Sequence, residues 1–280
     1  MVRKFAVLGS PIEHSKSPVI HAAAYRVLGL EEWQYERFEV RKGGLRNFMD
    51  SLDEEWSGFS LTMPLKEEAA RFAVSLDRAA EVTGAVNTLH RTDSGWLGFN
   101  TDVFGIVQAI HQANLGSLET ILVLGSGATA TSATAAIKQL APEAKIRFYA
   151  RNHRTRDQLV SFAKGLGLKA KPTRRLDKFL ASSDLVISTL PGGAMDSEAN
   201  RLSGSSRFKP SGALFDVAYQ PWPSELAKVW LQSEHPIISG LEMLLWQAVA
   251  QLRIFRFGDP AQQLPNEAAV LEAMRHSISS

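Results

Sequence analysis

The sequence predicts an α/β protein of two domains, and three observations support this. Short apolar runs alternate with segments of helical periodicity along the whole chain, which is typical of helices that connect the strands of a sheet. The 280 residues are enough for two domains of ordinary size. Near residues 102–116 the pattern changes and a second strand–helix series begins. We therefore expect two α/β domains.

Strands and helices of the first part follow one another closely. Ser17-Pro18 predicts a helix start, because Ser favours the N-cap and Pro the first helical position, and Gly29 ends that helix. Ser15 has no expected capping role. We expect strands at residues 3–9, 34–40 and 58–62, a hairpin at 86–100, and helices at 43–52, 64–75 and 102–114.

The second part contains a strand–helix–strand unit of about 30 residues. It comprises a strand at 119–125, a helix at 127–141 and a strand at 145–150. We then expect a helix from about Thr155, strands at 184–191 and 213–217, and helices at 241–257 and 267–276. The chain is expected to return to the first domain near Gly240.

Composition excludes several functional classes. With 31 Lys+Arg and 29 Asp+Glu the net charge is +2, so no charge excess suggests nucleic acid or an anionic membrane as partner. The absence of cysteine excludes disulfides, Cys-ligated zinc and thiol nucleophiles, and we expect no metal site. A hydrophobic content of 45% and no visible targeting segment predict a soluble, cytoplasmic protein.

The glycine-rich segment Gly125-Ser126-Gly127-Ala128-Thr129-Ala130 lies between a strand and a helix. The first glycine permits a tight turn, the second lets a pyrophosphate approach the backbone, and the small Ala130 allows close packing of helix on strand. The plainer alternative is a tight turn without a ligand. We interpret the segment as the dinucleotide loop of a Rossmann-type domain, with Gly125, Ser126, Gly127, Ala128 and Thr129 as cofactor contacts.

The end of the next strand indicates which dinucleotide binds. An NAD site usually has Asp or Glu there, to accept from the ribose 2′-hydroxyl. Here the segment Ala150–Arg156 contains three arginines, with no carboxylate before Asp157. Guanidinium groups suit a 2′-phosphate, although a solvated basic helix start is the alternative. We therefore favour NADP over NAD, held by Arg151, Asn152 and Arg154.

Four polar segments outside that unit are candidate substrate contacts. Hydroxyls of Ser15 and Ser17 could hold a carboxylate at a helix start, and Asn87 offers an amide at a strand start. A lysine in the first turn of a helix is electrostatically disfavoured, so Lys66 stands out, although a surface lysine is the simpler reading. Asp102 could be an N-cap or a catalytic carboxylate.

Together these segments resemble the shikimate dehydrogenase family. The family's GxPIxHSxSP, NVTxPxK, GAVNT and NTD motifs, glycine loop and GxxMLxxQ motif occur here in order. They read GSPIEHSKSP, SLTMPLK, GAVNT, NTD, GSGATA and GLEMLLWQ. The sequence departs from the pattern in three places: Ser60 replaces Asn, Val103 replaces a small residue, and the segment Thr129-Ala130-Thr131 lacks a customary arginine.

The resemblance implies reversible, NADPH-dependent reduction of 3-dehydroshikimate to shikimate, in aromatic amino-acid (chorismate) biosynthesis. Lys66 would exchange the proton and Asp102 would orient it, while Val217 and Gly240 would lie near the nicotinamide. The implied substrate contacts are Ser15, Ser17, Thr62, Lys66, Asn87, Asp102, Tyr219 and Gln247.

The resemblance also implies a domain plan. Residues 1–102 and 240–280 would form a substrate-binding catalytic domain and residues 103–239 a Rossmann-type NADP-binding domain, with the active site in a cleft between them. The protein would be a monomer or homodimer that binds small molecules but no nucleic acid or membrane. Two alternatives stay open: a quinate/shikimate dehydrogenase that uses NAD, and a catalytically inactive NADP-binding paralogue.

Overall fold

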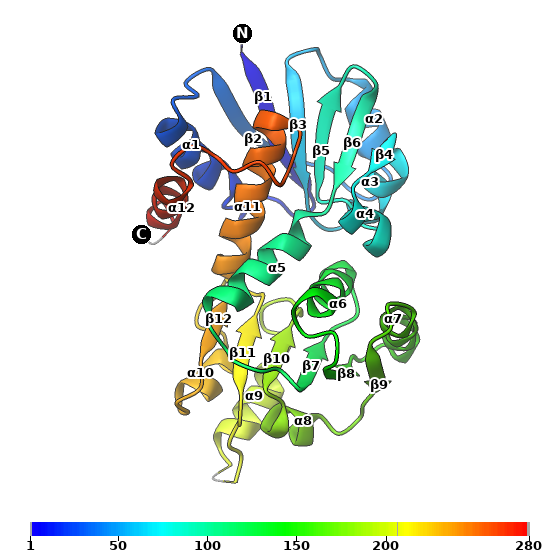
Figure 1. Ribbon diagram of the computed structural model, residues 1–280, viewed down its shortest axis with the longest axis vertical. Coiled ribbons are helices and arrows are strands. Elements are labelled where there is room, and N and C mark those ends of the chain that lie inside the picture. Colours follow the sequence, from blue (N-terminus) through cyan, green and yellow to red (C-terminus); the bar gives the residue numbers. More distant parts are fainter. Residues whose placement is uncertain (1, 206, 279–280) are drawn as a thin grey trace. The chain divides into compact units, whose positions relative to one another are not determined.

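The computed structural model describes residues 2–205 and 207–278 (Figure 1). The chain divides into two compact units. The first contains the residues up to Gly105 and those from Leu245 onward, and the second runs from Ile106 to Leu244. Both boundaries fall inside helices, α5 (Thr101–Gln112) and α11 (Gly240–Phe257). The α/β class expected from the sequence is confirmed, because each unit contains one six-stranded sheet with helices around it.

The sheet of the first unit is mixed. Its strands are β1 (Arg3–Gly9), β2 (Trp33–Glu39), β3 (Trp56–Leu61), β4 (Ser75–Leu76), β5 (Thr88–Thr92) and β6 (Gly95–Phe99), in the order β2-β1-β3-β5-β6-β4. The β2, β1 and β3 strands are parallel, whereas β3, β5 and β6 are antiparallel. The expected hairpin is the β5–β6 pair. This arrangement brings the end of β3 beside the start of β5, where Ser60 pairs with Thr88.

Helices cover both faces of this sheet. They are α1 (Ser17–Leu28), α2 (Leu45–Asp50), α3 (Lys66–Phe72), α4 (Arg78–Thr83), α12 (Glu267–His276) and part of α11. The α11 helix packs its Phe255 ring against Phe5, with the ring centroids 4.6 Å apart. A side chain at Gly58 would meet the same ring, because its Cβ would lie 2.5 Å from Phe255 Cε1. The glycine in β3 therefore lets α11 lie close to the sheet.

The second unit contains a fully parallel sheet. Its strands are β7 (Thr120–Leu124), β8 (Lys145–Tyr149), β9 (Lys169–Pro172), β10 (Leu185–Ser188), β11 (Ala213–Asp216) and β12 (Ile237–Ser239), in the order β12-β11-β10-β7-β8-β9. The chain runs outward from β7 in one direction and from β10 in the other. This is the doubly wound order in which ligands bind beyond the carboxyl ends of the strands, at the point of reversal between β7 and β10.

Five further helices flank the second sheet. They are α6 (Ala128–Leu140), α7 (His153–Gly165), α8 (Leu176–Ser182), α9 (Asp196–Ser203) and α10 (Glu225–Leu231). Small residues on α6 (Ala130, Ala133 and Ala136) are completely buried, which lets this helix lie close against its neighbours. Within the described residues, no helix combines the length and the apolar character needed to cross a bilayer.

The expected cap of the first long helix was wrong. Lys16 occupies the N-cap of α1 without a side-chain cap, and Ser17 is already the first helical residue. Ser15 does have a local role, since its Oγ accepts a hydrogen bond from the Ser17 N–H at 3.3 Å. The two serines thus belong to one turn, with Pro18 still inside the first turn of the helix.

Candidate functional site

Lys66 and Asp102 form an ion pair. Lys66 begins α3 and Asp102 is the second residue of α5. The Lys66 Nζ donates to Asp102 Oδ2 at 2.5 Å, and the two side chains are only 14% and 5% exposed. An ion pair at this depth is maintained only when further hydrogen bonds satisfy its remaining atoms.

Asn87 supplies such a bond. Its Nδ2 donates to Asp102 Oδ1 at 2.7 Å, so each carboxylate oxygen of Asp102 has its own donor. The Oδ1 of Asn87 accepts from the backbone N–H of Thr101 at 2.8 Å. The Asn87 side chain therefore bridges the start of β5 and the start of α5, and it fixes the direction in which Asp102 faces Lys66.

Thr88 and Gln251, which were not predicted as site residues, support Asn87 through a chain of hydrogen bonds. Thr88 Oγ1 donates to Asn87 Oδ1 at 2.9 Å, and Gln251 Nε2 donates to Thr88 Oγ1 at 3.1 Å. Gln251 lies one helical turn after Gln247 on α11, and both are buried. A pair of amides four residues apart on an otherwise apolar helix face was the signal that could have identified Gln251.

Ser17 belongs to a second buried polar cluster. Its backbone carbonyl accepts from His21 Nδ1 at 2.9 Å, and the His21 ring stacks on Tyr35 with centroids 3.9 Å apart. The Tyr35 hydroxyl is hydrogen-bonded to the Ser60 hydroxyl. Burial lowers the pKa of His21 to about 4 and raises the pKa of Tyr35. Ser60, which departs from the family pattern, is thus anchored by a tyrosine.

The remaining expected substrate contacts lie in both units. Thr62 follows β3, and its N–H donates to the Leu8 carbonyl at 2.9 Å. Gln247 is 8% exposed on α11 in the first unit. Tyr219 lies after β11 in the second unit, half-buried, and desolvation raises its pKa. The first unit alone therefore brings Lys66, Asn87 and Asp102 into direct contact.

The glycine loop follows β7, at the point of reversal of the second sheet. Gly125 has φ +109°, and a Cβ there would lie 2.4 Å from Thr189 Oγ1, so both the backbone and the space require glycine. Gly127 differs, because a Cβ on it would meet nothing within 4 Å. The open space above Gly127, at the N-terminus of α6, is what a pyrophosphate needs in order to reach the free N–H groups.

The basic segment after β8 divides into two kinds of arginine. Arg156 is 6% exposed and pairs with Asp157 at 2.8 Å, so its role is structural, and it was not among the expected phosphate contacts. Arg151 and Arg154 are exposed and make no side-chain hydrogen bond or ion pair with any other described residue. Asn152 caps α7 by accepting from the N–H groups of Arg154 and Thr155.

Two further connections position the cofactor side. Ser126 Oγ is hydrogen-bonded to Thr155 Oγ1 at 2.7 Å, which ties the glycine loop to the start of α7. Gly240 lies against Val217, because a Cβ on it would be 2.0 Å from the Val217 carbonyl oxygen. These residues follow β11 and β12 at the carboxyl edge of the sheet. The glycine loop, the exposed Arg151 and Arg154, and the close contact of Gly240 with Val217 are together compatible with a dinucleotide that has a 2′-phosphate.

No group of three or more His, Cys, Asp or Glu side chains in the described part of the chain is arranged to hold a metal ion. What the side chains of the Lys66–Asp102 region offer to a substrate is a proton on an oriented nitrogen and a set of hydrogen-bonding groups.

Comparison with known proteins gives a consistent result. Residues 7–89 match the family model of the shikimate dehydrogenase substrate binding domain. The shikimate dehydrogenase (NADP(+)) of Staphylococcus aureus is 30% identical over 275 residues, which cover 97% of this chain and 99% of the relative.

Solved structures agree along the whole chain. A shikimate 5-dehydrogenase from Mycobacterium fortuitum is 38% identical with a TM-score of 0.81, covering 99% of this chain and 98% of that one. Mycobacterium tuberculosis shikimate dehydrogenase is 36% identical with a TM-score of 0.83, covering 98% and 99%. The enzyme from Thermus thermophilus, solved in complex with NADP(H) and shikimate, is 28% identical with a TM-score of 0.81, covering 99% and 100%. This chain belongs to the shikimate dehydrogenase family.

Proposed function

We propose that this chain is an NADP-dependent shikimate dehydrogenase, which reversibly reduces 3-dehydroshikimate to shikimate in aromatic amino-acid biosynthesis. The observation that carries the proposal is the Lys66–Asp102–Asn87 arrangement, in which a partly buried ammonium group is oriented by a carboxylate with two separate donors. Membership of the family supplies the substrate and the cofactor. The relative from Thermus thermophilus, which binds both shikimate and NADP(H), supports the pairing.

Lys66 transfers the proton, and Asp102 orients Lys66. In reduction, NADPH supplies a hydride to the carbonyl carbon at C3. Lys66 Nζ gives a proton to the oxygen that becomes negatively charged, and in oxidation the same nitrogen accepts the hydroxyl proton. Asp102 holds the ammonium by its hydrogen bond at 2.5 Å, and Asn87 holds Asp102. Orientation of the donor before reaction lowers the entropic part of the barrier.

The substrate side of the proposal assigns the carboxylate to Ser15 and Ser17, which share one turn at the start of α1. Thr62, Asn87 and Gln247 would contact the ring hydroxyls, and Tyr219 would contribute from the second unit. Hydroxyl and amide groups suit a small, polyhydroxylated carboxylic acid, because each can donate or accept as the substrate requires.

The cofactor side assigns the pyrophosphate to the loop from Gly125 to Thr129 and the 2′-phosphate to Arg151 and Arg154. Asn152 uses its Oδ1 to cap α7, so its contact with the phosphate would use the Nδ2 group. Val217 and Gly240 would lie beside the nicotinamide. Residues 1–102 and 240–280 would then be the substrate-binding part and residues 103–239 the NADP-binding part. A cytoplasmic monomer or homodimer completes the proposal.

The direct test is to incubate the purified protein with shikimate and NADP+ and to follow the absorbance of the reduced nicotinamide. We expect NADPH to accumulate and the product to have the mass of 3-dehydroshikimate. A protein that binds NADPH but gives neither signal would contradict the proposed activity. It would favour the catalytically inactive alternative instead.

A further inference from the structure

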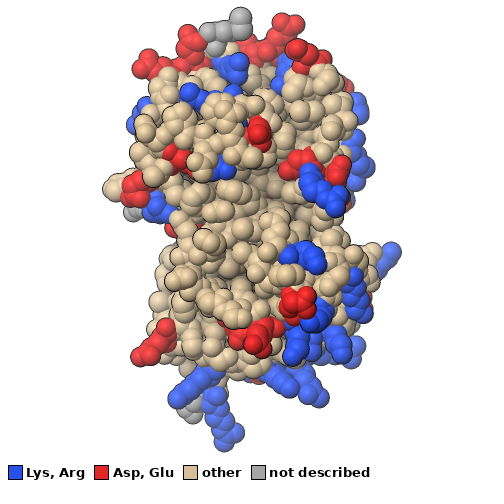
Figure 2. Space-filling view, in the orientation of Figure 1, with Lys and Arg blue, Asp and Glu red and all other residues tan. Residues whose placement is uncertain are grey.

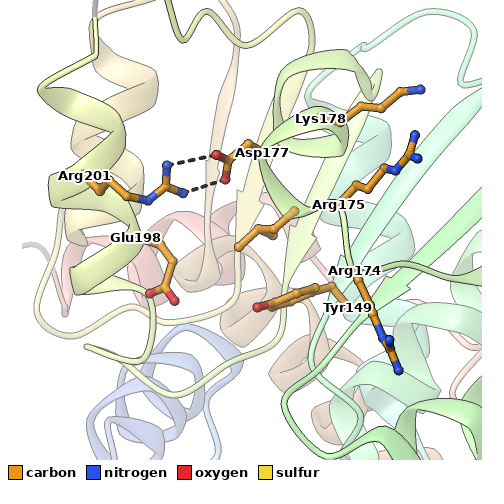
Figure 3. Close-up of a pocket in the computed structure, with 8 residues that line it drawn as sticks. Tyr149, Arg174, Arg175, Asp177, Lys178, Glu198 and Arg201 are labelled. Atoms are coloured by element: carbon orange, nitrogen blue, oxygen red, sulfur yellow. Dashed lines mark hydrogen bonds and ion pairs between the residues drawn. The ribbon is translucent and has the colours of Figure 1, made fainter.

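An open pocket of about 470 Å³ lies in the second unit between α8, α9 and the end of β8. Its wall includes the ring of Tyr149, and several basic side chains surround it (Figure 3). Figure 2 shows Lys and Arg side chains gathered over this part of the unit, near α7, β9 and α8. The pocket therefore combines an aromatic surface with positive charge, which suits part of a nucleotide.

The charges around the pocket are not equivalent. Arg201 forms a two-pronged ion pair with Asp177, with distances of 2.9 and 2.6 Å, so its charge is compensated (Figure 3). Arg174 is exposed, and its side chain makes no hydrogen bond or ion pair with another residue in the described ranges. Figure 3 shows Arg174 extending past Tyr149 and away from the Asp177–Arg201 pair, whereas Arg175 extends in a different direction.

Strand register brings Arg174 level with the basic segment after β8. The β8 and β9 strands are parallel neighbours in which Phe148 pairs with Pro172. The Thr173 N–H continues the ladder by donating to the Phe148 carbonyl at 2.9 Å. Arg174 is therefore two residues past its strand's last pair and Arg151 three residues past, on strands about 4.8 Å apart. Both side chains are long enough to reach one anion between them.

Two arginines at neighbouring strand ends repel each other unless an anion lies between them. We propose that Arg174 is a second ligand of the cofactor's 2′-phosphate, contributed by the turn after β9, opposite Arg151 from the turn after β8. The inference rests on the proposed function, because it assumes that the dinucleotide is NADP. Each guanidinium group donates to a different phosphate oxygen, so the phosphate is held from two strands.

Arg174→Ala and Arg175→Ala are matched variants, because each removes one positive charge from the same turn. We expect Arg174→Ala to raise the dissociation constant of NADPH about tenfold, equivalent to about 1.4 kcal/mol, and to leave that of NADH within twofold. Arg175→Ala should change both by less than twofold. Binding is measured by fluorescence titration of the intact protein, so the result does not depend on turnover.

Adenosine 2′-phosphate and adenosine 5′-phosphate separate the phosphate contact from any contact with the base. Arg174→Ala should weaken competition by the first compound against NADPH and leave competition by the second unchanged. Equal NADPH affinities for wild type and Arg174→Ala would overturn the inference, as would equal losses in the two arginine variants. The proposed function is tested separately, by shikimate oxidation with the wild type, and its result does not depend on how the Arg174→Ala variant binds NADPH.

Discussion

The Lys66 ammonium group donates to Asp102 Oδ2 at 2.5 Å, across 36 residues of sequence. The two residues lie in the first turns of separate helices, α3 and α5, and Asn87, directly before β5, lies between these helices in the sequence. Because Asn87 occupies the other carboxylate oxygen, Asp102 has one orientation available toward Lys66. The starts of α3 and α5 thus fix the position of the Lys66 ammonium group, which the sequence alone shows only as a charged residue.

Replacement of Lys66 tests the assigned role. Lys66→Ala removes the proton donor, and we expect turnover to fall by at least about a hundredfold, since general acid–base groups contribute at least that much. The affinity for NADPH should stay within twofold, because Lys66 has no assigned cofactor contact. Lys42→Ala removes an exposed lysine of the same unit and should behave as wild type. Near-normal turnover in Lys66→Ala would refute the assignment.

The two loop glycines should differ in what they do. Gly125→Ala forces an alanine to φ +109° and against Thr189, so we expect a loss of about 2 kcal/mol in the free energy of unfolding. Gly127→Ala meets no neighbour and should leave unfolding unchanged, yet its methyl group would obstruct the pyrophosphate and weaken NADPH and NADH alike. Denaturant titration of both variants measures the free energy of unfolding, and cofactor titration measures the affinities for NADPH and NADH. Unaltered cofactor affinity in Gly127→Ala would count against the loop as the phosphate site.

Arg151 and Arg154 should discriminate between cofactors. The double variant Arg151→Ala, Arg154→Ala is expected to weaken NADPH about tenfold or more while NADH binding changes little, because only NADPH has the 2′-phosphate. Lys138→Ala, on the exposed side of α6, is a suitable charge control. If both cofactors lost affinity equally, these arginines would not be the phosphate clamp.

His21 should make stability depend on pH. Burial lowers its folded-state pKa to about 4, whereas the unfolded chain has the ordinary value of 6.5. Between these values the unfolded state binds more protons, so the free energy of unfolding decreases as pH falls from about 6.5 toward 4. The shift corresponds to a loss on the order of 3 kcal/mol. We expect the free energy of unfolding, measured by urea titration, to differ less between pH 6.5 and pH 4.5 in His21→Gln than in the wild type. An identical difference would contradict the burial of a neutral ring.

Long periodic elements were predictable from the sequence because their signals are local. Strand β1 and helix α12 have the expected bounds, and the strand and helix around the glycine loop agree within a few residues. Short elements with weak periodicity were not recognised. Helix α8 has seven residues and strand β12 three, and both owe their existence to packing on the sheet.

The candidate site was predictable only where a motif exists. Lys66 and Asp102 were identified by their flanking residues, and their contact agrees with that choice. Gln251 and Tyr35 were missed, because each acts through a partner distant in sequence: Thr88 for one, Ser60 for the other. The ion pair between Arg156 and Asp157 was not predicted either, because nothing in the order of charged residues distinguishes Arg156 from Arg151 and Arg154.

The central claim is tested most directly by steady-state kinetics of the wild type with shikimate or quinate, each combined with NADP+ or NAD+. The account predicts that shikimate with NADP+ has the highest kcat/KM and that replacing NADP+ by NAD+ lowers it at least about tenfold, through loss of the phosphate contacts. A higher kcat/KM for quinate with NAD+ would contradict it.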